Sequence, residues 1–151
     1  MSLQQARQLR LHPQATNTRG AVDAANDAVY VPGHDALADG TRLPPGQVFA
    51  QSWRLRNTGS AAWGSGYTLV CVGGVRLGAA AAVPIPACLV GESVAIAVSF
   101  VAPQEPGDYL SIWQLATPDG QPFGDQVWTA IEVAATSAAD SILIRDLAPP
   151  A

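Results

Sequence analysis

Hydrophobic and polar residues alternate with a period of two through the middle of the chain, from about residue 35 to residue 134. The most regular run is residues 94–100, where large apolar side chains interleave with alanine and serine. Successive side chains of a strand point to opposite faces of its sheet, so this alternation predicts half-buried strands. Five such runs stand out, at residues 49–55, 67–72, 94–100, 109–115 and 127–133.

Turn signals rich in glycine and proline separate these runs, for example at residues 57–59, 106–108 and 118–120. Short strands at close spacing, with no helical period between them, are typical of an antiparallel β-sandwich rather than an α/β fold. The alanine run 79–82 resembles a helix, but Gly78 before it and Pro84 after it leave no room for one. We therefore expect a flat strand or connection there, within an all-β domain.

Both ends of the chain differ from this alternating region. Residues 1–34 are polar and turn-rich, and residues 136–151 begin polar before the apolar stretch 142–147. We predict an N-terminal arm (1–34), a sandwich (35–135) and a C-terminal tail (136–151), with arms that become ordered only by docking on a partner. The predicted docking residues are Leu9, Leu11, Val29, Tyr30, Ile142, Ile144 and Leu147.

Composition narrows the function classes. The chain has 151 residues, 48% of them hydrophobic, and a net charge of −4, with eight arginines and no lysine. One core-forming domain fits this length, and the missing basic face argues against nucleic acid as a partner. No apolar run is long enough to cross a bilayer, so we expect no membrane insertion. The first residues show no export signal, which predicts a cytoplasmic or virion-associated protein, and the lysine-free, alanine-rich composition indicates a prokaryotic or phage genome.

Candidate catalytic chemistry is scarce. His12 and His34 are the only histidines, and both lie in the predicted arm. No nucleophile, phosphate-binding or dinucleotide-binding motif is present, so we expect no catalytic residue, metal site or cofactor. Cys71 and Cys88 are too few for a disulfide framework. Two reduced, buried thiols are the default, and one internal disulfide is the alternative.

Four tryptophans lie within 76 residues. Trp53 is in phase with Phe49 and Leu55, which predicts a core position. Trp128 is out of phase with the apolar residues around it, so it should lie on the opposite face, where only an arm or a partner could cover it. Phase does not place Trp113, because both faces of its strand are apolar, and Trp63 falls just after a turn.

These tryptophans, together with the turn glycines and prolines around them, resemble the FW (four-tryptophan) domain. This is the immunoglobulin-like central domain of selective-autophagy cargo receptors, and it also occurs in bacterial proteins. The matching stretches are residues 39–41, 45–46, 49–59, 102–103, 106–109, 113–115 and 123–128, together with Trp63. The resemblance covers residues 35–134. It does not extend to the autophagy role, because this chain has no room for the receptors' other binding regions.

The resemblance implies a non-enzymatic sandwich of about seven to eight strands that binds protein or peptide segments through surface aromatics and strand edges. On this basis the candidate partner-binding residues are Trp63, Trp113, Phe123 and Trp128. The alternative is a structural subunit of a larger assembly, such as a virion-decorating or scaffold protein, whose arms clasp neighbouring copies in a homo-oligomer. A third hypothesis, carbohydrate binding on exposed tryptophan faces, fits the missing export signal poorly.

Overall fold

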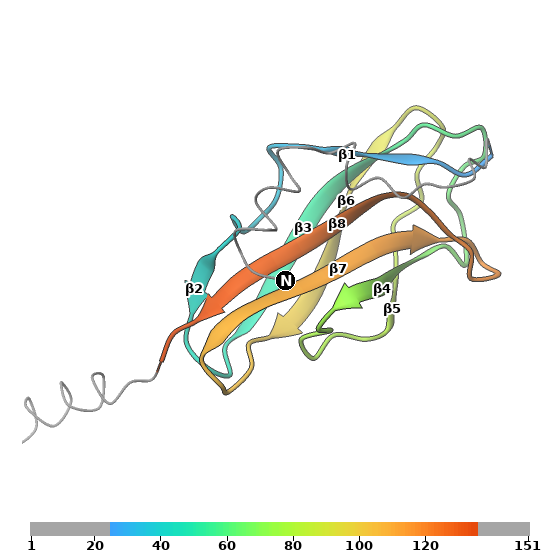
Figure 1. Ribbon diagram of the computed structural model, residues 1–151. Helices are drawn as coiled ribbons and strands as arrows, with labels where there is room; N and C mark the ends of the chain where they lie inside the picture. Colours follow the sequence, from blue (N-terminus) through green and yellow to red (C-terminus); the bar gives the residue numbers. More distant parts are fainter. Residues whose placement is uncertain (1–24, 136–151) are drawn as a thin grey trace, which may run out of the picture.

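The structure is a computed structural model that describes residues 25–135. These residues form a β-sandwich with no helix in the described range (Figure 1). Its strands are β1 (Ala28–Val31), β2 (Thr41–Leu43), β3 (Val48–Asn57), β4 (Thr68–Gly74), β5 (Ala82–Pro84), β6 (Ser93–Val101), β7 (Gly107–Ala116) and β8 (Pro122–Val133).

The strands form two sheets packed face to face. One sheet has three strands in the order β1-β3-β6, and the other has five in the order β2-β8-β7-β4-β5. All neighbours are antiparallel except β2 and β8, which pair in parallel. The expected fold class, an all-β immunoglobulin-like sandwich of seven to eight strands, is confirmed.

The five alternating runs correspond to β3, β4, β6, β7 and β8, and β5 begins at Ala82, the last residue of the alanine run. The short strands β1 and β2 escape prediction because three or four residues are too few to show a period of two. β1 lies within the predicted N-terminal arm, yet it pairs with β3 from Ala28 to Val31. This segment is therefore part of the three-stranded sheet.

The core lies between the two sheets and is dominated by aromatic side chains. Phe49 and Phe100 stack within the three-stranded sheet, and Phe100 meets Trp113 of the five-stranded sheet edge to face, with ring centroids 5.9 Å apart. Trp53 is fully buried, which confirms its predicted core position. Its indole Nε1 donates a hydrogen bond to the Trp128 carbonyl oxygen at 2.8 Å. Such rings bury large apolar areas and hold the layers together.

A buried glutamine connects the two layers through polar contacts. Gln51 of β3 is almost fully buried, and its Nε2 donates to the Leu37 carbonyl and to the Thr129 hydroxyl of β8. Its Oε1 accepts the Leu37 N–H at 2.9 Å. Because a buried amide is tolerated only when it is hydrogen-bonded, Gln51 fixes the loop before β2 against both sheets.

Candidate protein-interaction surfaces

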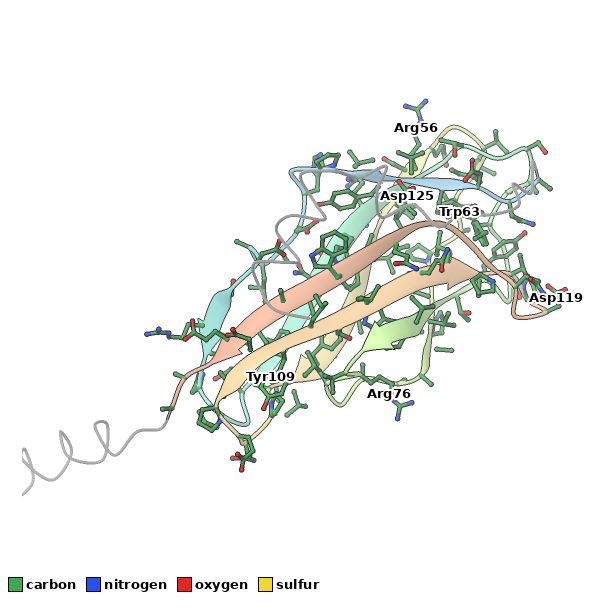
Figure 2. All side chains as sticks on the ribbon, in the orientation of Figure 1. Arg56, Trp63, Arg76, Tyr109, Asp119 and Asp125 are labelled. Carbon is green, nitrogen blue, oxygen red and sulfur yellow. The ribbon has the colours of Figure 1, made fainter. Side chains whose placement is uncertain are left out.

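Three of the four candidate partner-binding aromatics lie in the main core. Trp63 forms an isolated bridge with Cys88, and its ring packs near Phe123, with 6.1 Å between the centroids. Trp113 donates from Nε1 to the Ser111 hydroxyl at 2.7 Å. Trp63 and Trp113 have no exposed surface, and Phe123 has very little (Figure 2 labels Trp63). They offer no accessible ring to a partner because the space between the sheets is filled by these side chains.

Trp128 occupies a different place. It pairs with Ile112 across β7 and β8, and it clusters with Leu110, Ile112 and Ala130 on the outer face of the five-stranded sheet. The phase argument is therefore right about the face. The side chain is nevertheless only 5% exposed.

The predicted docking residues fall into two groups. Val29 and Tyr30 belong to β1, where Tyr30 packs against the core and donates its hydroxyl to Asp35 at 2.9 Å. The Tyr30 side chain therefore docks on its own sandwich. The other predicted docking residues, Leu9, Leu11, Ile142, Ile144 and Leu147, lie outside the described residues.

Strand β6 presents an unpaired edge. It pairs with β3 from Ser93 to Val101, and the Val101 N–H donates to the Leu77 carbonyl, on the side away from β3. Backbone direction alternates along a strand, so Ala95, Ala97 and Ser99 also direct their N–H and C=O groups away from β3. Within residues 25–135 these groups have no backbone partner. They form a ready-made template for one more strand.

The other sheet edges are protected. β2 and β5 are only three residues long, and β5 ends in Pro84. The edge of β1 is partly occupied, because Asp125 of β8 accepts the Tyr30 N–H at 2.9 Å. β6 is nine residues long and contains no proline and no charged residue. Natural sheets usually block an edge of this length with lysine, proline or a bulge, so β6 is the exception in this molecule.

The side chains beside the β6 edge differ in character from one end of the strand to the other. At one end Val48 and Val101 pair on the outer face and are 66% and 41% exposed. At the other end Arg54 donates to the Ser93 hydroxyl at 3.0 Å, and Arg56 points away from the sandwich (Figure 2). Between them lie the small residues Ala95, Ala97 and Ser99. Among the described strands, no acidic side chain lies on this outer face.

The cysteines are both free thiols, and Cys88 is buried. The pKa of the Cys88 thiol is raised, mainly because the side chain is buried. A hydrogen bond from the Asn57 backbone lowers this pKa, and the negative charge of Glu92 raises it further. A thiol with a raised pKa is a poor nucleophile.

Over residues 25–135 no group of three or more histidine, cysteine or acidic residues is placed to hold a metal ion. The same range contains no helix that is long and apolar enough to cross a membrane.

Comparison with known proteins gives matches over the sandwich. A family model described as the Ig-like domain from next to BRCA1 gene matches residues 36–133. Protein JOKA2 of Solanum tuberosum is 39% identical over 101 residues, which cover 64% of this chain and 12% of that protein. The NBR1 homolog of Arabidopsis thaliana is 38% identical over 104 residues, covering 66% and 15%. The human next to BRCA1 gene 1 protein is 37% identical over 100 residues, covering 64% and 10%.

The comparison corrects one expectation and confirms another. The matched relatives come from plants and animals, so the prokaryotic or phage origin inferred from composition is wrong. The expected association with a virion is not supported by these relatives. The matches span about an eighth of the first relatives' length, and they confirm the resemblance to the FW domain. This chain belongs to the family of Ig-like domains described from next to BRCA1 gene.

Proposed function

We propose that this chain is a non-enzymatic protein-interaction module that binds an extended protein segment as an additional strand on β6. The observation that carries the proposal is the unpaired edge at Ala95, Ala97 and Ser99. Added strands gain affinity from main-chain hydrogen bonds and specificity from alternate side chains. Membership of an Ig-like domain family supports an interaction role, and a cytoplasmic location stays a prediction.

The side chains around β6 specify the partner segment. Small side chains at Ala95 and Ala97 leave room above the sheet, and the exposed pair Val48 and Val101 favours an apolar side chain at that end. The guanidinium of Arg56, and that of Arg54 beside it, favour a carboxylate at the other end. The partner is therefore an extended segment with apolar residues at one end and an acidic residue about 20–26 Å away, because Arg54 and Arg56 lie six and eight residues beyond Val48 along β3, at about 3.3 Å per residue.

A proline substitution tests this binding mode without breaking the sheet. The Ala97 N–H points away from β3, so Ala97→Pro removes no existing ladder bond but blocks the edge. The matched control, Ala97→Ser, keeps the N–H. Random peptides of about twelve residues, long enough to pair along the whole strand, are selected on the immobilised full chain, and the dissociation constants of the selected peptides are then measured for all three proteins.

We expect peptides that contain an acidic residue to bind the natural chain and the Ala97→Ser variant equally, and to bind Ala97→Pro at least about tenfold more weakly, since one blocked bond also displaces its neighbours. Circular dichroism checks that the variant keeps its sheets. Equal binding to Ala97→Pro would place the site elsewhere and refute the proposal. The alternative, a structural subunit whose arms bind neighbouring copies, stays a prediction.

A further inference from the structure

The outer face of the five-stranded sheet carries a second apolar cluster. Leu110 and Ile112 of β7 lie opposite Ala130 and Trp128 of β8. This cluster is separate from the core between the sheets, because side chains at alternate positions of β7 and β8 point to the opposite face. It is also distinct from β6, which lies in the other sheet.

The burial of this cluster exceeds what its own sheet can provide. Leu110 and Trp128 are each 5% exposed, and Ala130 is 1% exposed. An indole that lies on a sheet contacts the sheet with one side only, so its other side needs a cover. In Figure 1 no other labelled strand lies in front of β7 and β8. The cover therefore comes from outside the described strands.

We propose that the N-terminal segment of this same chain, residues 1–24, docks on the outer face of β7 and β8 over Trp128. The described chain begins next to this surface. A Cβ atom at Gly124 would lie 2.7 Å from the Ala28 Cβ, and Asp125 accepts the Tyr30 N–H. Trp128 is only three residues further along β8, about 10 Å away, and a segment of 24 residues reaches far beyond that distance.

Charge favours this segment over the C-terminal one. Asp108 and Glu132 lie opposite each other at one end of the outer face, where Arg42 pairs with Glu132 at 3.1 Å. The only charged side chains of residues 1–24 are three arginines and one aspartate, whereas those of residues 136–151 are two aspartates and one arginine. A basic segment complements an acidic rim, and an acidic one is repelled. Residues 1–24 also contain leucines at positions 3, 9 and 11 that fit an apolar surface.

Tryptophan fluorescence of the full chain can test this docking directly. Trp53, Trp63 and Trp113 have no exposed surface, so a change in acrylamide quenching reports Trp128. The test variant is Leu9→Glu with Leu11→Glu, and the matched control is Gln8→Glu with Gln14→Glu, which adds the same charge and keeps both leucines. If circular dichroism shows that the double leucine variant has lost its sheets, Leu11→Ser is used in its place.

In the leucine variant we expect acrylamide to quench about a quarter more of the tryptophan emission, because one of the four tryptophans becomes exposed to solvent. The emission should also shift to the red. The control should match the natural chain, and light scattering should give the monomer mass of 15.6 kDa. Unchanged quenching in the leucine variant would overturn the proposal. A natural chain of twice that mass, whose Trp128 becomes quenchable on dilution, would also overturn it and assign the cover to a second copy.

Discussion

Gly124 is the residue at which β1 meets β8. Its φ is +76°, and a Cβ atom there would lie 2.7 Å from the Ala28 Cβ and 2.9 Å from the Ala28 nitrogen. Gly120, in the turn between β7 and β8, has a similar φ of +90°, but a Cβ atom there would meet nothing within 4 Å. The two glycines therefore separate the cost of the backbone conformation from the cost of a steric clash.

We expect Gly120→Ala to lower the free energy of unfolding by about 1–2 kcal/mol, the cost of a positive φ in a residue with a side chain. Gly124→Ala should lower it by a further 1–3 kcal/mol, about the cost of overpacking, because β1 must move. Urea unfolding followed by tryptophan fluorescence measures both values. Equal losses in the two variants would show that Ala28 yields freely and that β1 is loosely held.

The Cys88 thiol gives the molecule a specific alkaline dependence. Its pKa in the folded protein is raised above the ordinary thiol value of 9.0, mainly because the side chain is buried. As the pH rises, the unfolded chain releases the thiol proton at a lower pH than the folded protein does. The stability that the protonated thiol contributes is therefore complete below pH 9.0 and is lost as the pH rises through the folded pKa.

Between pH 8 and pH 10 we expect the natural chain and Cys71→Ala to lose more stability than Cys88→Ala does. The comparison is made on the change with pH rather than on the stability itself, because removing the Cys88 sulfur also leaves a cavity. Urea midpoints at the two pH values provide the measurement. An identical pH-dependent loss in Cys88→Ala would mean that other groups cause the alkaline effect.

At the scale of elements, sequence patterning predicts the long strands and misses the short ones. β3, β6, β7 and β8 are each nine or more residues long, and their phase correctly places Trp53 inside and Trp128 outside. β1 and β2 have four and three residues, and tertiary pairing places them: β2 runs parallel to β8 some 90 positions away. No local pattern contains that information.

The candidate site is harder to predict because it consists of absent hydrogen bonds. A sequence shows that residues 94–100 alternate, but β6 becomes an edge only because β3 pairs with it on one side and none of the strands described between residues 25 and 135 lies on the other. Aromatic residues draw attention for the opposite reason. Trp63 and Trp113 are conspicuous in the sequence, yet they fill the space between the sheets. The lack of lysine and proline within β6 could not have indicated the edge, because interior strands lack these residues too and this chain contains no lysine at all.

For the whole molecule, net charge determines whether the open edge of β6 leads to self-association. The chain carries a net charge of −4 near neutral pH and has a pI of about 4.8. Repulsion between copies disappears near the pI. β6 has no charge or proline of its own to oppose pairing with a second copy. We therefore expect light scattering by the natural chain to rise as the pH approaches 4.8.

Two lysine variants distinguish the edge from net charge. Ala97→Lys places a charge at the open edge, and Gln121→Lys places the same charge in the exposed turn between β7 and β8. Both move the pI equally, so scattering is compared at the pI of each variant. If β6 mediates the association, Ala97→Lys should scatter several-fold less there than Gln121→Lys, because lysine on an edge opposes strand addition whatever the net charge. Equal scattering by the two variants would assign the association to net charge alone and remove the self-pairing role of β6.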